Sequence, residues 1–81
     1  MKIKIKTFAR VRELCGFDEK ELTVSDGITI REVVRHLKKS QPSFAEYNGP
    51  LLFAINEEYR PEETVLADSD TLAILPPVSG G

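Results

Sequence analysis

The sequence predicts an α+β domain, a roll in which one mixed sheet of about four or five strands is covered by one main helix. Its 81 residues are enough for one domain and too few for two. Apolar residues recur with a period of two in some segments, which is typical of strands, and with helical spacing in others. These segments follow one another in the order strand, short helix, strand, long helix and three strands. Because the first and last strands are both rich in residues that favour β structure, we expect them in the same sheet.

The chain begins with an alternating strand and a short helix. Lysine and isoleucine alternate over residues 2–7, which indicates a half-buried strand with a lysine-bearing outer face. Phe8 follows on that lysine face, so it is a candidate interface residue unless a bulge turns its ring into the core. Residues 9–15 show helical spacing of apolar side chains, with Cys15 as a small packing residue, and Gly16 is a natural C-terminal cap.

A second strand over residues 19–24 leads to the best-defined element, a long helix that starts at Thr29. Thr29 and Glu32 form a capping box, and the helix is expected to end near Ser40, just before a proline. His36 lies nearly opposite the apolar stripe on the helical wheel, which predicts a solvent-exposed side chain. The stripe consists of Ile30, Val33, Val34 and Leu37.

The second half of the chain supplies the remaining strands. Residues 43–50 are expected to form a connection with a possible single helical turn. The continuous apolar run at residues 51–55 predicts a central strand that is buried on both faces, and a short strand is expected near Tyr59. Residues 71–75 form the last strand, in which alternation places Leu75 on the outward side.

Composition and charge exclude several classes of function. Ten of the eleven Lys and Arg residues lie in residues 1–39, but the net charge of −2 is not that of a nucleic-acid-binding protein. The apolar stretches are too short to span a membrane and no signal peptide is visible, so a cytoplasmic location is expected. One cysteine and one histidine argue against a metal site. The glutamates at positions 57, 58, 62 and 63 are expected to form a solvated face rather than an acid/base site.

The last six residues have a composition that packing does not explain. Pro76 and Pro77 cannot donate hydrogen bonds to a sheet, so the strand must stop and a stiff extended tail must leave it. Gly80 and Gly81 lack side chains, so they could enter a channel only a backbone wide and leave the terminal carboxyl open to attack. A carboxylate needs activation before it reacts, most simply as an acyl-adenylate made by another protein. These residues therefore predict a carrier with a domain at 1–75 and a flexible tail at 76–81.

The chain resembles the MoaD/ThiS family of sulfur carriers, and within it the molybdopterin synthase branch. The resemblance covers nearly the whole chain and is strongest in the terminal Pro-Pro-Val-Ser-Gly-Gly sequence. It is carried by four segments, residues 8–16, 52–56, 68–70 and 75–81.

This resemblance implies a ubiquitin-like β-grasp fold and a role as the sulfur-donating subunit of a two-part enzyme, with no catalytic activity of the chain alone. An activating enzyme would use ATP and magnesium to adenylate Gly81, and a sulfur donor protein would convert it to a thiocarboxylate. The large synthase subunit would bind the tail, supply the catalytic side chains and pair with the small chain as a heterotetramer. The implied tail residues are Pro76, Pro77, Val78, Ser79 and Gly80, and the implied interface residues are Phe8, Leu75 and Arg12.

Three other functions are also compatible with the sequence. A Gly-Gly end is also compatible with a ubiquitin-like modifier that is joined to lysines of target proteins. The chain could instead carry sulfur for another pathway, either thiamine synthesis or thiolation. It could also be a plain binding module whose tail has no role.

Overall fold

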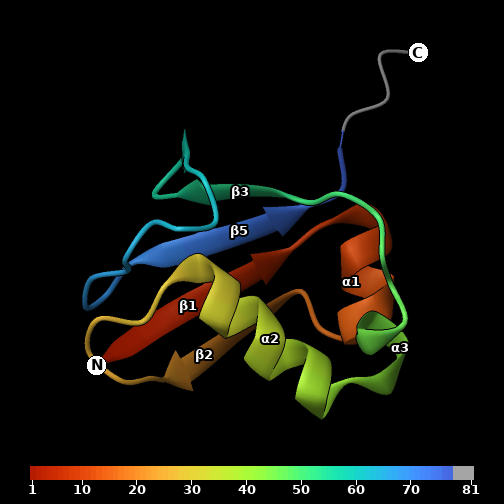
Figure 1. Ribbon diagram of the computed structural model, residues 1–81, viewed down its shortest axis with the longest axis horizontal. Coiled ribbons are helices and arrows are strands. Elements are labelled where there is room, and N and C mark those ends of the chain that lie inside the picture. The colour runs from red at the N-terminus through yellow and green to blue at the C-terminus, as the bar shows by residue number, and fades with distance from the viewer. Residues whose placement is uncertain (78–81) are drawn as a thin grey trace.

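The computed structural model describes residues 1–77, and within them five strands form a single mixed sheet in the order β2-β1-β5-β3-β4 (Figure 1). The predicted order of strands and helices is confirmed, and a short third helix fills part of the expected connection. The elements are β1 (Lys2–Thr7), α1 (Ala9–Cys15), β2 (Glu19–Thr23), α2 (Ile30–Ser40), α3 (Pro42–Ala45), β3 (Leu52–Ile55), β4 (Glu58–Tyr59) and β5 (Thr71–Leu75).

The first and last strands lie side by side at the centre of the sheet, as their composition predicted. β5 runs parallel to β1, whereas β2 is antiparallel to β1 and β3 is antiparallel to both β5 and β4. Because two parallel strands cannot be joined by a tight turn, the chain between them crosses over the sheet and includes α2. The sheet is therefore mixed, and its middle strand, β5, is the one that leads to the end of the chain.

The prediction for residues 51–55 is confirmed in part, because the strand is present and mostly buried but does not lie at the centre of the sheet. β3 lies second from the edge of the sheet and is not its central strand. It is buried on both faces at Phe53, Ala54 and Ile55, as predicted, whereas Leu52 at its start keeps 36% of its surface exposed. The physical reason is the shortness of β4, whose pairing reaches only Ala54 and Ile55 and leaves the start of β3 uncovered.

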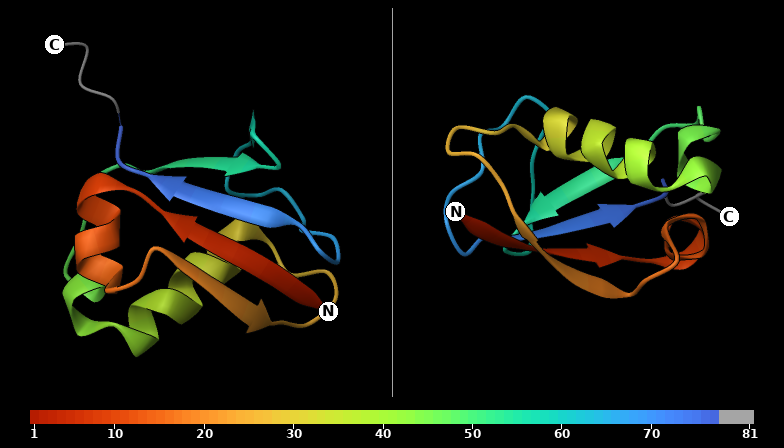
Figure 2. Two further views of the ribbon diagram at one scale, coloured as in Figure 1. Left: turned by 180° about the vertical axis from the view of Figure 1, so that it is seen from behind. Right: turned by 90° about the horizontal axis from the view of Figure 1, so that it is seen from below.

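The hydrophobic core lies between α2 and one face of the sheet (Figure 2, right). The predicted capping box at Thr29 and Glu32 is present, and the helix turns its apolar stripe inward. The helices α1 and α3 close one end of this core with Cys15 and Phe44. The fully buried aliphatic residues that meet from the helices and the sheet are Ile3, Ile5, Val11, Ile30, Val33, Leu37, Leu72 and Ile74.

One helix and one strand end at the glycine and the proline that the sequence indicated. Gly16 ends α1 with φ of 80°, a left-handed conformation that other residues rarely adopt, and its amide donates to the carbonyl of Arg12. β5 ends at Leu75, immediately before Pro76. None of the helices within residues 1–77 is long and apolar enough to span a bilayer.

Candidate functional site

The face of the sheet that points away from α2, which we call the outer face, carries the candidate site. Residues opposite one another on neighbouring strands point to the same side of a sheet. The register therefore lines up Lys6, Ala73, Ala54 and Tyr59 in one row across the outer face. Leu75 lies opposite Leu52 in the next such row. The outer face thus combines a lysine-bearing side on β1 with an apolar side on β5, β3 and β4.

Phe8 belongs to the outer face and not to the core. The residue follows β1 directly, has extended backbone dihedrals with φ of −138° and keeps 43% of its surface exposed. The next residue, Ala9, has φ of +50°, so the chain bends sharply into α1 at this point. A hollow on the outer face is lined by Phe8 together with Lys6, Asn56, Glu57, Thr71 and Ala73. The alternative of a bulge that buries the ring is therefore wrong.

Leu75 lies where β5 leaves the sheet. The two preceding core residues, Leu72 and Ile74, are fully buried, whereas Leu75 points to the outer face and is half-buried. The outward direction predicted for Leu75 is confirmed, although β3 shields part of the side chain. Pro76 is half-buried and Pro77 is exposed. The predicted tail residues Val78, Ser79, Gly80 and Gly81 lie outside the described residues.

The end of β5 fixes the place from which the chain continues. β1 and β5 are parallel, so both end on the side of the sheet where α1 and α3 lie, opposite the N-terminus (Figures 1 and 2). Phe8 and Leu75 each occupy the end of one of these two adjacent strands. The structure thereby brings an exposed aromatic ring and an apolar strand end to the base of the C-terminal segment.

Arg12, the third predicted interface residue, is not part of this apolar surface. Its guanidinium lies 3.3 Å from the carboxylate of Asp18, and both side chains are exposed. Its backbone amide donates to the carbonyl of Phe8, which links the first turn of α1 to the strand end. Arg12 therefore lies beside the candidate site as half of an ion pair in solvent.

Sequence reasoning missed two exposed apolar residues of the outer face, Leu52 and Tyr59. Tyr59 has 67% of its surface exposed on the edge strand β4. The alternating pattern of residues 71–75 predicted that Leu75 points outward. Only the pairing of β3 with β4 and β5 shows that Leu52 and Tyr59 lie on the same face of the sheet as Leu75. Cross-strand register is a non-local property that a short apolar run does not reveal.

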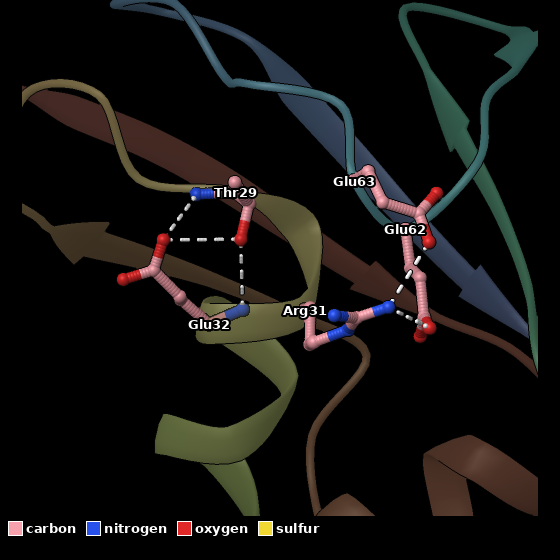
Figure 3. A network of polar contacts seen from close by, with 5 residues as sticks. All are labelled: Thr29, Arg31, Glu32, Glu62 and Glu63. Carbon is pink, nitrogen blue, oxygen red and sulfur yellow. Dashed lines mark hydrogen bonds and ion pairs between the residues drawn. The ribbon is translucent and has the colours of Figure 1, made fainter.

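Cys15 is buried in the core, and two of the glutamates are held in an ion pair. Burial raises the pKa of the Cys15 thiol to about 11, so the side chain is a neutral core residue near neutral pH. Residues 1–77 contain no group of three or more side chains able to hold a metal ion. The predicted solvated face of glutamates is present in part as an ion pair, in which Glu62 and Glu63 both bind Arg31 (Figure 3). The hydrogen bond from Arg31 to Glu62 raises the pKa of the guanidinium, which stays charged.

A mixed sheet of this order, crossed by one main helix and leading into the C-terminus from its central strand, defines a protein of the ubiquitin-like β-grasp class. The model of the ThiS family matches residues 5–81, and the chain belongs to this family. The molybdopterin synthase sulfur carrier subunit of Arabidopsis thaliana is 37% identical over 81 residues, which cover 100% of this chain and 84% of that protein.

Two solved structures extend the comparison. A Pyrococcus furiosus protein assigned as molybdopterin converting factor, subunit 1, superposes with a TM-score of 0.86 at 31% identity, covering 96% of this chain and 99% of that one. The small archaeal modifier protein 1 of Methanosarcina acetivorans superposes with a TM-score of 0.78 at 32% identity, covering 99% and 96%. The same fold is thus shared by a protein named as a subunit of a molybdopterin converting factor and by one named as a modifier.

Proposed function

We propose that this chain is the sulfur carrier and donor subunit of a molybdopterin synthase. The single observation that carries the proposal is the path of β5, which ends at Leu75 beside an apolar outer face and leads into a sequence that finishes with Gly80 and Gly81. Family membership and the name of the Arabidopsis thaliana relative support the same role. In this role the chain by itself is not an enzyme, and the reactive group that it supplies is the terminal carboxylate of Gly81.

The chemistry would take place on the carboxylate of Gly81. A carboxylate oxygen attacks the α-phosphorus of magnesium-bound ATP in an activating enzyme, and pyrophosphate leaves. Sulfur at the oxidation level of sulfide, delivered by a donor protein, then attacks the acyl-adenylate carbon and AMP leaves with one of the original carboxylate oxygens. The product is a thiocarboxylate, whose sulfur is a better nucleophile than the oxygen it replaces. ATP and magnesium belong to the partner, and the chain itself needs no cofactor.

Sulfur delivery would require a large synthase subunit that docks on the outer face. Phe8 and Leu75 would be the apolar anchors, because partly exposed aromatic and aliphatic side chains lose the most water on binding. The segment from Pro76 to Gly81 would then enter the large subunit, where the thiocarboxylate attacks a cyclic pyranopterin monophosphate. The large subunit would contribute the catalytic side chains, and two copies of each chain would form a cytoplasmic heterotetramer. Arg12 would lie at the rim of this contact.

The direct test is the intact mass of the full chain after incubation with ATP, magnesium, an activating enzyme and a sulfur source. We expect exchange of one terminal oxygen for sulfur, and no such exchange in a variant that lacks Gly81. This variant should fold normally, because residues beyond a strand end contribute little to the core. An unmodified wild-type chain, in a reaction where a known carrier becomes modified, would refute the proposal.

A protein-modifier role is the second candidate, because the chain is 32% identical to the small archaeal modifier protein 1 of Methanosarcina acetivorans. This role predicts isopeptide bonds between Gly81 and lysines of other proteins, which appear as high-mass conjugates in cell extracts. A sulfur carrier for thiamine synthesis or for thiolation predicts a thiocarboxylate that fails to convert the pyranopterin precursor when the large subunit is present. Each outcome is distinct from conversion of that precursor to molybdopterin.

A further inference from the structure

The solvent-facing side of α2 is strongly basic, and the proposed sulfur chemistry does not use it. The helix carries Arg31, Arg35, Lys38 and Lys39 against a single carboxylate, Glu32. That carboxylate is held at the first turn of the helix, where it accepts hydrogen bonds from the amide and hydroxyl of Thr29 at 3.1 Å (Figure 3). Glu32 is therefore engaged in the helix cap, and among residues 1–77 it forms no salt bridge with the cations of the later turns.

Only one of these four cations has a carboxylate partner among residues 1–77. Arg31 binds Glu62 at 2.7 Å and Glu63 at 3.0 Å (Figure 3). Lys38 donates to the backbone carbonyl of Tyr47 at 3.0 Å, and its ammonium lies 5.5 Å from the centre of the Phe44 ring. These contacts fix its position but pair it with no carboxylate. Arg35 and Lys39 are exposed, and no carboxylate of residues 1–77 lies within salt-bridge distance of either side chain.

Helix electrostatics alone does not explain this arrangement. Lys38 and Lys39 lie in the last turn, where cations interact favourably with the helix dipole. Arg35 lies in the middle of the helix, four residues from both Arg31 and Lys39, and like charges at this spacing destabilise a helix. The sequence thus keeps an unfavourable stripe of cations along the solvent-facing side of the helix.

The same surface is hollowed into a groove with a volume of about 540 Å³. The groove runs beside α2 and is bordered by α3 and by the segment that follows β4. Its apolar lining comes from Val34 and Ala45, and its only acidic lining residue is Glu62, which is already engaged with Arg31. The lining is completed by Arg31, Arg35, Lys38 and Lys39.

We propose that this groove docks an acidic segment of a partner protein, one that places an apolar side chain between carboxylates. The carboxylates would bind Arg35, Lys38 and Lys39, and the apolar side chain would cover Val34 and Ala45. A nucleic acid fits less well, because the chain has a net charge of −2 and Glu62 faces the groove. The groove belongs to the helical layer, whereas the candidate site is on the opposite face of the sheet (Figure 2, right). A partner in the groove therefore leaves the outer face free for a second protein.

The test uses the full chain and a short fluorescent peptide of alternating glutamate and leucine. A peptide of the same length with glutamine in place of glutamate is the control for charge, and a single-stranded DNA oligonucleotide is the control for a general polyanion. Fluorescence anisotropy measures affinity. Backbone amide NMR shifts locate the bound peptide, and we expect the largest shifts at Val34, Arg35, Lys38 and Ala45.

The variant Arg35→Glu with Lys39→Glu should weaken peptide binding at least about tenfold, since two favourable contacts become repulsive. The matched control is Lys4→Glu with Lys20→Glu, which makes the same change in net charge at two exposed lysines that do not line the groove. Its effect should be less than about threefold, from long-range electrostatics alone. A single Arg35→Gln variant, which adds no repulsion, should give an intermediate loss.

Four outcomes would overturn the proposal. These are no saturable binding of the acidic peptide, equal losses in the two double variants, amide shifts concentrated on the outer face, and tighter binding of the oligonucleotide to the same helix. The peptide assay involves neither Gly81 nor the activating enzyme. Its result is therefore independent of the test of sulfur transfer.

Discussion

Two phenylalanines of this chain separate stability from partner binding. Phe44 on α3 is fully buried, whereas Phe8 on the outer face is 43% exposed. Replacing Phe44 with alanine removes a core ring and leaves a cavity, which costs about 3–5 kcal/mol. Replacing Phe8 removes only a partly buried ring at a surface where water fills the space, so about half of a full burial energy is lost, on the order of 1 kcal/mol.

These magnitudes have clear consequences for a domain of this size. At roughly 0.05–0.15 kcal/mol per residue, 81 residues give a total stability of about 4–12 kcal/mol. Phe44→Ala should therefore remove a large part of the free energy of unfolding, and Phe8→Ala should leave the chain folded. If Phe8 anchors the large synthase subunit, its loss should weaken that complex by about 2 kcal/mol, or roughly 30-fold in Kd.

Urea unfolding followed by circular dichroism gives both stabilities, and titration calorimetry with a large synthase subunit gives the affinity of Phe8→Ala. The reasoning requires that Phe44→Ala lowers the free energy of unfolding much more than Phe8→Ala does. It also requires that Phe8→Ala weakens binding of the large subunit although the variant stays folded. Equal destabilisation by the two substitutions would show that Phe8 is a core residue. Unchanged affinity in a stable Phe8→Ala variant would show that the docking surface lies elsewhere.

Three further predictions concern local structure. Asn56 and Glu57 form the two-residue turn between β3 and β4 with φ of 49° and 73°. Glu57→Gly should therefore relieve backbone strain and raise the free energy of unfolding by about 1 kcal/mol, whereas Glu58→Gly in the adjacent strand should lower it. Urea midpoints that move the other way would contradict this. Thr29→Ala breaks the capping box and should cost about 1 kcal/mol, and a midpoint equal to that of the wild type would show that the cap is not stabilising. Burial favours the neutral thiol of Cys15, so the unfolded state loses its proton first and stability should fall as pH rises from about 9 to about 11, by up to about 1.4 kcal/mol per pH unit. Cys15→Ala should remove this part of the pH dependence, and an identical profile in the variant would contradict the assignment.

Elements whose ends depend on local chemistry were predictable from the sequence. The capping box at Thr29 and Glu32 fixes the start of α2, because both hydrogen-bonding partners lie within one turn of the helix. Gly16 ends α1 through its own backbone conformation, and Pro76 ends β5 because it cannot donate to the sheet. These signals also placed the C-terminal segment directly after the last strand, which is the central feature of the proposed carrier.

Features that depend on contacts between distant residues were decided by the tertiary structure alone. The apolar run at residues 51–55 indicated a strand, but its place near the edge of the sheet follows from its pairing with β5 and the short β4. The exposure of Phe8 depends on the bend at Ala9, and the apolar outer face depends on the register that sets Leu52 opposite Leu75. Sequence patterns report hydrogen bonds and periodicity within a few residues, whereas a shared surface is made by chain segments that meet only after folding.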